Sequence, residues 1–250
     1  MNFFSKIFPT LLLTLSLVGC KTTQWGHSTS THNYVINSQV EEDSSIIRYY
    51  LPYKQKMEIE MNRVIAFAED NLYRTRSEAE SSAGNFFVDA LLEIGKTLDP
   101  DVQFSIATKF GIRADIKKGD VTIGNIYELM PFENYITILE IKGSEMANLL
   151  QFMANTGGQP IAGMTMKIKD GKPVDVFIQG QPFDINKNYK LVTYDYLANG
   201  GDRILGLDNP ISRKDSGILV RNGLIDYLKK LTSEGKTINT KLDGRVQIIK

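Results

Sequence analysis

YDYLANGGD, the stretch from Tyr194 to Asp202, follows an apolar strand candidate at Tyr189–Thr193 and ends it with an aromatic residue, an amide, two glycines and a carboxylate. Paired glycines allow positive φ angles and let a ligand approach the backbone closely. An aromatic face and a carboxylate beside such a turn can stack on a flat ring and accept hydrogen bonds from hydroxyl groups. A strand-to-helix turn with a buried tyrosine produces the same pattern, so the rest of the chain has to separate the two interpretations.

The composition indicates one globular domain with a polar tail. Of the 250 residues, 42% are hydrophobic and 23% are charged, which is typical of a folded domain. Basic and acidic residues number 29 each, so we expect no nucleic-acid partner. The two histidines, His27 and His32, lie near the N-terminus, and no HExxH or similar ligand cluster occurs. We therefore expect no metal centre and no cofactor in this chain.

Residues 1–20 have the pattern of a bacterial lipoprotein signal peptide. Lys6 precedes an apolar run, Leu11–Val18, that is too short to span a bilayer. The run ends in Leu17-Val18-Gly19-Cys20, which resembles a lipobox, whose cysteine is lipidated. The alternative is a soluble secreted protein with a chance cysteine at its cleavage site. We expect export to the bacterial cell envelope and a lipid anchor to a membrane at Cys20.

Residues 21–45 are polar and are predicted to form a flexible tether, whereas residues 46–250 carry the apolar patterns of a folded domain. The apolar spacing from Ile46 to Met61 is helix-like but is interrupted by Pro52, which predicts a helix that begins near Pro52 and has this proline in its first turn. The strongest helical pattern lies between Glu80 and Leu98, where apolar residues recur every three or four positions. This helix is expected to face the core.

The remaining patterns favour a mixed sheet. Asp170-Gly171 between two alternating runs predicts a β-hairpin. Ser144 is the expected cap of a helix that runs to about Ala154. Residues 205–214 are interpreted as irregular, before a helix from Gly217 to Leu231. Because several strands are joined by hairpins, the predicted fold class is α+β, a mixed β-sheet with packed helices. Further strands are predicted at 63–68, 101–107, 135–141 and 245–249.

Four segments, in order and at matching spacing, resemble the C-terminal, substrate-binding domain of the 5′-nucleotidase family. The first resembles the family's helix-opening E-x-x-x-G-N-x-x-x-D-A, the third its L-P-F-x-N and the fourth its F-L-A-N-G-G-D, with Tyr in place of Phe. The similarity extends from about Arg48 to Lys250. The segments are Glu80–Leu91, Gly111–Ile116 with Gly119–Thr122, Leu129–Asn134 and Tyr194–Asp202.

The resemblance implies a nucleotide or nucleoside ligand. In the family, two aromatic residues sandwich the base, and they correspond to Phe132 and Tyr196. The carboxylate that accepts ribose hydroxyls corresponds to Asp202, and the arginine on the phosphate side corresponds to Arg113, whose planar fork suits phosphate oxygens. The stretch Asn199-Gly200-Gly201 completes the predicted binding set.

Each of these residues also has a purely structural interpretation. Phe132 can fill the core after a proline, and Tyr196 can be a half-buried packing residue. Asp202 can be a turn residue or a helix cap after two glycines, and Arg113 can form a surface salt bridge.

The chain departs from the family pattern at three positions near the predicted site. A second ligand-contacting arginine of the family is replaced by Ala79, and Arg74 and Arg76 lie nearby but out of register. The family's N-x-G-G-I-R has Thr108 for its asparagine and Phe110 for its first glycine. A phenylalanine there would crowd the ligand or restrict φ, and one lost charged contact is worth about 1.5–3 kcal/mol.

In the family, a metallophosphatase domain with two metal ions and a catalytic His/Asp pair precedes this domain. About thirty polar residues separate Cys20 from the folded region, and because the chain begins with Met1 and a signal peptide we expect that it is not a fragment. The leading hypothesis is a substrate-binding domain whose catalysis depends on a separate metallophosphatase chain, which would carry the divalent metals. We assign no catalytic residue here. The alternatives are a standalone nucleoside-binding lipoprotein and a degenerate domain used for protein–protein contact.

Overall fold

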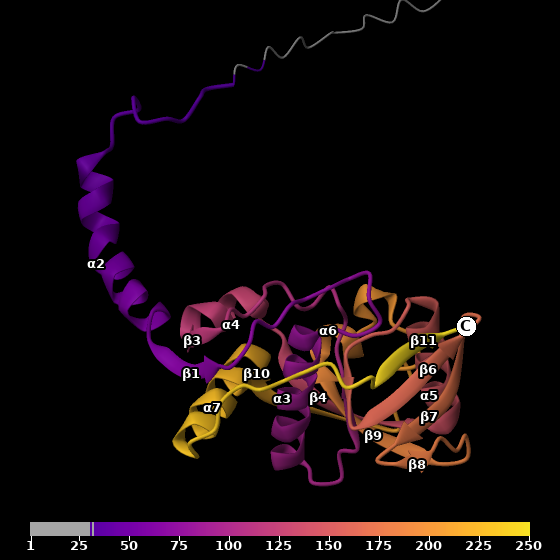
Figure 1. Ribbon diagram of the computed structural model, residues 1–250. Helices are drawn as coiled ribbons and strands as arrows, with labels where there is room; N and C mark the ends of the chain where they lie inside the picture. The colour runs from indigo at the N-terminus through magenta and orange to yellow at the C-terminus, as the bar shows by residue number, and fades with distance from the viewer. Residues whose placement is uncertain (1–30, 32) are drawn as a thin grey trace, which may run out of the picture. The chain divides into compact units, whose positions relative to one another are not determined.

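Two mixed β-sheets and a short two-stranded sheet carry the helices of this domain (Figure 1). The computed structural model describes residue 31 and residues 33–250, so the predicted signal peptide, Cys20 and the start of the tether lie outside the described residues. Residues 48–250 form one compact unit. Within the described part of the chain, no helix is both long enough and apolar enough to cross a membrane.

The larger sheet has five strands in the order β10-β4-β9-β2-β5. Strand β9 lies at its centre, antiparallel to β4 and parallel to β2. Its last residue, Tyr194, is paired with Ile136 of β4. The bounds are β2 Phe104–Ile106, β4 Tyr135–Lys142, β5 Ile161–Ala162, β9 Asn188–Tyr194 and β10 Ser212–Leu219.

The second sheet has the order β11-β6-β7-β8, and β1 pairs with β3. Asp170 and Gly171 both have positive φ, 49° and 71°, as the turn between β6 and β7 requires, so the predicted hairpin is confirmed. Strand β11 is parallel to β6, which makes this sheet mixed as well. The bounds are β1 Val64–Ala68, β3 Gly119–Thr122, β6 Met164–Lys169, β7 Lys172–Ile178, β8 Gln181–Pro182 and β11 Val246–Ile249.

Helix α3 is the main core helix, and the predicted α+β class is confirmed. Phe87 and Leu91 on its apolar face are fully buried, and the helix contacts β2, β5, β9 and α7. Gly95 allows this close packing, because a Cβ there would lie 2.6 Å from the Val192 side chain of β9. The helices are α2 Ser44–Met61, α3 Ser82–Leu98, α4 Ile123–Leu129, α5 Gly143–Asn155, α6 Asp195–Ala198 and α7 Val220–Ser233, with the 3₁₀ turn η1 at Gly201–Arg203.

Three local predictions are wrong. Pro52 lies inside α2, which begins at Ser44, where the Asp43 carboxylate accepts hydrogen bonds from the N–H groups of Ser45 and Ile46. Ser144 does not cap α5, because Lys142 is the N-cap residue and makes no side-chain cap bond. Part of the region predicted as irregular, together with the predicted start of the last helix, forms strand β10.

The first family-like segment has a structural role that its sequence does not reveal. Glu80 accepts hydrogen bonds from the backbone N–H groups of Asp243 (2.8 Å) and Gly244 (3.0 Å). Asp89, further along in α3, accepts a 2.6 Å hydrogen bond from Arg245. Asn85 donates to both Glu80 and the Lys241 carbonyl oxygen. This segment therefore fastens residues 241–245, which lead into β11, to the first half of α3.

Candidate ligand-binding site

The turn after β9 is built by its own side chains. Asp195 opens α6, and its carboxylate accepts hydrogen bonds from the N–H groups of Tyr196 (2.8 Å) and Tyr135 (3.0 Å), which ties the turn to β4. Gly200 adopts φ 82°, a left-handed conformation that favours glycine. At Gly201 a Cβ would lie 2.5 Å from the Tyr196 carbonyl oxygen, so only glycine fits there. The two glycines are thus required by the backbone itself.

A cavity of about 270 Å³ opens beside this turn. It is formed where the loop after β2, the loop before β4 and the turn after β9 meet. Four residues of the predicted binding set line it, from three segments that are far apart in the sequence. The lining residues are Phe110, Gly111, Arg113, Phe132, Asn134, Tyr194, Tyr196 and Asp202.

The two predicted stacking residues keep their rings accessible. Phe132 is 37% exposed and Tyr196 is 47% exposed, so neither fills the hydrophobic core. The guanidinium carbon of Arg113 lies 5.6 Å from the centre of the Phe132 ring, within the range of a cation–π contact. Among the residues described, Arg113 has no carboxylate within 4.0 Å. The salt-bridge interpretation of Arg113 therefore has no support in the structure.

The Asp202 carboxylate is held on both oxygens. The Tyr196 hydroxyl donates to Oδ1 (3.1 Å) and accepts from the Asp202 N–H (3.2 Å). The buried Thr108 hydroxyl donates to Oδ2 in a short hydrogen bond. Asp202 itself sits in the 3₁₀ turn with φ 53° and ψ 17°, a left-handed conformation that aspartate tolerates better than most residues. Two hydroxyl groups thus fix both the conformation and the direction of this carboxylate.

Tyr194 lies beneath these groups and is almost completely buried. Its hydroxyl oxygen has no hydrogen-bond partner among the described residues. Burial raises the pKa of Tyr194 to about 12, and the nearby polar groups of Thr108 offset part of this rise. The Thr108 groups are not placed to form a hydrogen bond with the Tyr194 oxygen. Gly111 must be glycine, because a Cβ there would overlap the same hydroxyl oxygen. The ring packs edge-on against Phe87 of α3, at 6.5 Å between centroids.

The loop that carries Phe132 is anchored by the first turn of α7. The buried Arg221 guanidinium donates to the Phe132 carbonyl oxygen (3.4 Å) and to the Glu133 carboxylate (3.1 Å). It also lies 4.7 Å from the centre of the Tyr127 ring. The Val220 N–H donates to the Asn134 carbonyl oxygen (2.9 Å). Sequence reasoning missed Arg221, because nothing in the local pattern links it to a loop almost ninety residues earlier.

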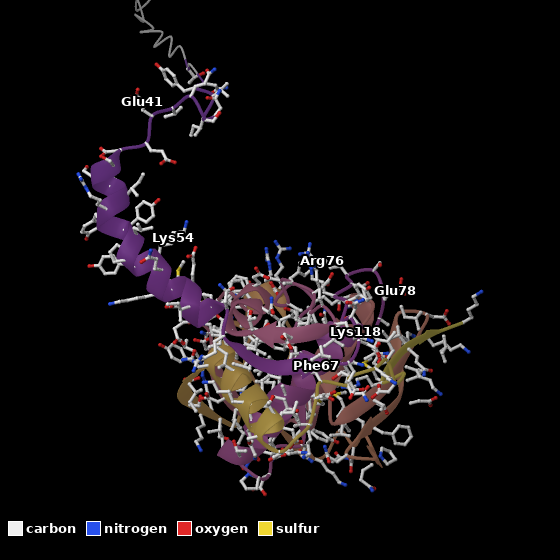
Figure 2. All side chains as sticks on the ribbon, turned by 60° about the vertical axis from the view of Figure 1, so that its left-hand side comes forward. Glu41, Lys54, Phe67, Arg76, Glu78 and Lys118 are labelled. Atoms are coloured by element: carbon white, nitrogen blue, oxygen red, sulfur yellow. The ribbon has the colours of Figure 1, made fainter. Side chains whose placement is uncertain are left out.

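One of the departures from the family pattern, Phe110, lies at the rim of the cavity. Phe110 is not among the residues with positive φ, so its backbone is unstrained, and its half-exposed ring forms one wall. The guanidinium carbon of Arg76 lies 4.6 Å from the centre of this ring. Figure 2 shows Arg76 and Glu78 on the loop between β1 and α3. Ala79, further along that loop, packs against the core instead.

Not every predicted residue lies on the cavity. Asn199 accepts a 2.7 Å hydrogen bond from Arg213, and neither it nor Gly200 or Gly201 is part of the lining. Asn134 lines the cavity, although the sequence indicates it only as part of a motif. Its place two residues after Phe132 in the same loop was the signal that could have assigned it.

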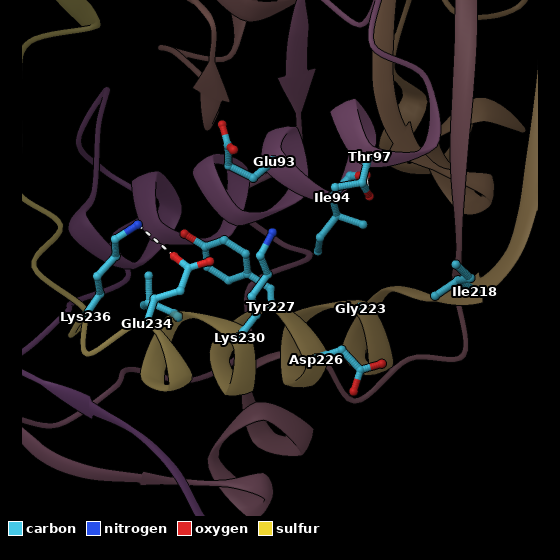
Figure 3. A pocket seen from close by; sticks show the side chains of 11 residues that line it. Glu93, Ile94, Thr97, Ile218, Gly223, Asp226, Tyr227, Lys230, Glu234 and Lys236 are labelled. Carbon is cyan, nitrogen blue, oxygen red and sulfur yellow. Dashed lines mark hydrogen bonds and ion pairs between the residues drawn. The ribbon is translucent and has the colours of Figure 1, made fainter.

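A larger cavity, of about 450 Å³, lies between α3 and α7 (Figure 3). On its charged rim, Lys236 lies 2.7 Å from Glu234, and Asp226 lies 3.6 Å from Lys229. None of the residues predicted to bind a ligand lines it. In the described part of the chain, no three His, Cys, Asp or Glu residues are grouped so that they could hold a metal ion.

Comparison with known proteins agrees with this architecture. The chain is 27% identical to protein UshA of Yersinia enterocolitica over 197 residues, which are 77% of this chain and 36% of that protein. It is 25% identical over 200 residues to a 5′-nucleotidase of Vibrio vulnificus, covering 78% of this chain and again 36% of the relative. The chain thus spans little more than a third of the length of these relatives.

The crystal structure of a 5′-nucleotidase precursor from Thermus thermophilus superposes with a TM-score of 0.70 at 28% identity. The match covers 83% of this chain and 44% of that one. A family model described as "5′-nucleotidase, C-terminal domain" matches residues 64–208, more than half of the sequence. The chain therefore belongs to the family of 5′-nucleotidase C-terminal domains.

Proposed function

We propose that the 270 Å³ cavity binds the nucleoside part of a nucleotide, with the base between Phe132 and Tyr196. Asp202 faces the sugar, and Arg113 faces the phosphate. One observation carries this proposal: residues that the family resemblance links to ligand binding come from three distant segments and line a single cavity. Phe132 and Tyr196 are accessible aromatic residues, and Arg113 has no carboxylate partner in the described structure.

The dimensions and chemistry of the cavity suit such a ligand. Its volume lies just below the roughly 300–1,000 Å³ found for small-molecule sites, which favours one nucleoside unit over a dinucleotide. Stacking of a base on an aromatic ring is worth about 1–3 kcal/mol and does not depend on which base is bound. The Arg113 guanidinium can donate two parallel hydrogen bonds to phosphate oxygens. A nucleoside monophosphate is therefore the expected ligand.

Calorimetry tests binding directly. The full-length chain is titrated with adenosine and with AMP, and the measurement is repeated on Phe132→Ala. Loss of one stacking face should weaken both ligands by about 5- to 150-fold, given about 1–3 kcal/mol per stacked base. Phe177→Ala is the matched control, because Phe177 is similarly exposed (40%) but lies on β7, away from the cavity. If the unmodified chain binds neither adenosine nor AMP, the proposal is refuted. An equal loss of affinity in Phe132→Ala and Phe177→Ala would also refute it.

We assign phosphate hydrolysis to a separate metallophosphatase chain that supplies the divalent metals. The proposal rests on the family relationship and on the side chains around the cavity, which offer groups to bind a base, a sugar and a phosphate. Purified protein with AMP and Mn²⁺ should release no phosphate, and a phosphatase should copurify from the native membrane. Phosphate release by the purified chain alone would contradict the assignment. Ligand binding without a copurifying phosphatase would instead support a standalone nucleoside-binding lipoprotein.

We further propose that the protein is held at a membrane of the cell envelope by lipid on Cys20, which lies outside the described residues. The Leu-Val-Gly-Cys sequence at residues 17–20 and the apolar run before it support this proposal. Fractionation of cells that express Cys20→Ser provides the test. The variant should move from the membrane fraction to the soluble fraction, whereas retention in the membrane fraction would contradict lipid anchoring.

A further inference from the structure

Helix α2 carries an apolar stripe that no part of the described structure covers. Tyr50, Tyr53 and Met57 stand at positions i, i+3 and i+7, so they lie on one face of the helix. Their exposed fractions are 42%, 66% and 54%, and no residue of α2 is buried. Met61 continues the stripe and packs against the core. Apolar anchors at this spacing are typical of a helix that binds in a groove.

The same part of α2 is basic. From Arg48 to Met57 the sequence contains Arg48, Lys54 and Lys56 but no aspartate or glutamate. Among the described residues, only one of these three cations has a carboxylate within 4.0 Å: Lys54 lies 3.8 Å from Glu58 of the same helix. The stripe is therefore offered on a helix segment with three positive charges.

The cavity of about 450 Å³ between α3 and α7, which we call the α7 groove, has the complementary character (Figure 3). Ile94, Ile218, Tyr227 and Leu231 contribute its apolar lining. Three carboxylates and two ammonium groups also line it, so the net charge of the groove is negative. These charged residues are Glu93, Asp226, Glu234, Lys230 and Lys236.

The two surfaces also match in length. The 14 residues of α7 span about 21 Å, and the segment from Arg48 to Met57 spans about 15 Å. In the structure α2 does not occupy the groove of its own chain. The connection to β1 is stiff, because the N–H groups of residues 62 and 63 still donate to the carbonyl oxygens of Glu58 and Glu60. Folding α2 back onto its own α7 would break these hydrogen bonds.

We propose that two copies of this chain form a dimer in which α2 of each copy lies in the α7 groove of the other. One chain carries both complementary surfaces, so a second copy supplies the occupant that each surface lacks. The dimer has two-fold symmetry and forms the contact twice, which doubles the area that one short helix buries. In this dimer the stripe covers the apolar lining, and the basic groups of α2 face Glu93 and Asp226. The inference goes beyond the proposed function, because the nucleoside cavity takes no part in it.

Sedimentation velocity measures the dimer directly. The full-length chain with Cys20→Ser, which cannot carry a lipid, should sediment at twice the mass of one chain. Tyr53→Asp places a charge on the stripe and should raise the dissociation constant of the dimer at least about tenfold. Asp226→Lys should also raise it, because the new cation faces the basic helix. Gln55→Asp is the matched control: it lies on the opposite face of α2, is equally free of buried contacts, and should leave the dissociation constant within about twofold.

Cross-linking identifies the two surfaces. Because Cys20 is the only cysteine in the sequence, a chain with Cys20→Ser accepts one new thiol at a chosen position. One tagged chain carries Tyr53→Cys, and a second, differently tagged chain carries Thr97→Cys, which lines the groove from α3. A short bismaleimide should join the two kinds of chain when they are mixed. Gln55→Cys in place of Tyr53→Cys should give no mixed product.

The other outcomes overturn the inference. A chain that sediments as a monomer excludes the dimer, and a monomer that binds lipid vesicles or a phosphatase through Tyr53 assigns the stripe to that occupant instead. A dimer whose dissociation constant is unchanged by Tyr53→Asp does not use the stripe. If Tyr53→Cys cross-links only to itself, the two stripes pair with each other and the groove is not involved. None of these measurements uses a nucleoside, so they are independent of whether the 270 Å³ cavity binds AMP.

Discussion

Replacing Tyr194 by phenylalanine should stabilise the protein, although most core substitutions destabilise. The Tyr194 hydroxyl is buried and has no hydrogen-bond partner among the described residues. An unpaired buried polar group costs about 1–3 kcal/mol. Phenylalanine removes this cost and keeps the ring that packs against Phe87. Because one oxygen atom of packing is lost as well, we expect a net gain of about 1 kcal/mol.

The same substitution should change how stability depends on alkaline pH. Burial raises the pKa of Tyr194 from about 10 in the unfolded chain to about 12 in the folded one. Between these values the unfolded chain releases the hydroxyl proton and the folded chain keeps it, so the free energy of unfolding falls as the pH rises. The slope from this group is about 1.4 kcal/mol per pH unit. Tyr194→Phe lacks this contribution, so its advantage should grow between pH 10 and pH 12.

Thermal and urea unfolding followed by circular dichroism measure both effects. A gain of about 1 kcal/mol corresponds to an increase of about 2–4 °C in Tm for a domain of this size. The measurement is made at pH 7 and at pH 11, with Tyr73→Phe as an exposed control. A Tm lowered by Tyr194→Phe at pH 7 would refute the reasoning, because it would mean that the hydroxyl is paired, for example with Thr108 or a bound water.

Two other substitutions test how the cavity is held together. Gly111→Ala should lower the free energy of unfolding by about 1–3 kcal/mol, because the new methyl group overlaps the Tyr194 hydroxyl. Urea unfolding should show that a Gly111→Ala, Tyr194→Phe double variant recovers most of this loss. Additive effects of the two substitutions would contradict the contact between residue 111 and the Tyr194 hydroxyl. Arg221→Met should weaken adenosine binding in calorimetry because it releases the loop that carries Phe132. If Arg221 acts through Phe132, adding Arg221→Met to Phe132→Ala should reduce the affinity for adenosine little further. A further loss of affinity as large as that of Arg221→Met alone would show that Arg221 does not act through Phe132.

Local patterns predicted the elements whose burial repeats regularly. Helix α3 is predicted because its apolar residues recur every three or four positions and face the core along its length. The β6–β7 hairpin is predicted because the Asp-Gly pair supplies the positive φ angles that its turn requires. Strand β10 was missed because most of its side chains are exposed, so neither face carries an apolar alternation. The apolar spacing in α2 predicted a helix that the structure contains, although none of its residues is buried.

The candidate site was predictable only where its residues form contiguous motifs. Arg113, Phe132 and Asp202 each lie in a motif, and the fold brings the three motifs to one cavity. The positions of Tyr194 and Arg221 could not be predicted in this way. Their roles arise from contacts with segments more than eighty residues away in sequence, which no local spacing encodes.

The departures from the family pattern at Thr108, Phe110 and Tyr196 all contact neighbouring side chains, and these contacts bear on whether the cavity is maintained. Tyr196 in place of phenylalanine and Thr108 in place of asparagine both donate to Asp202, so the two changes complete one hydrogen-bonded network. Phe110 in place of glycine stacks against Arg76, which is itself out of register with the family arginine. Substitutions that accumulate without selection leave buried polar groups unpaired, and each unpaired group costs stability. Paired departures of this kind favour a maintained ligand-binding cavity over a degenerate domain kept for protein contact, and calorimetry of the unmodified chain with adenosine and AMP is the measurement that decides between them.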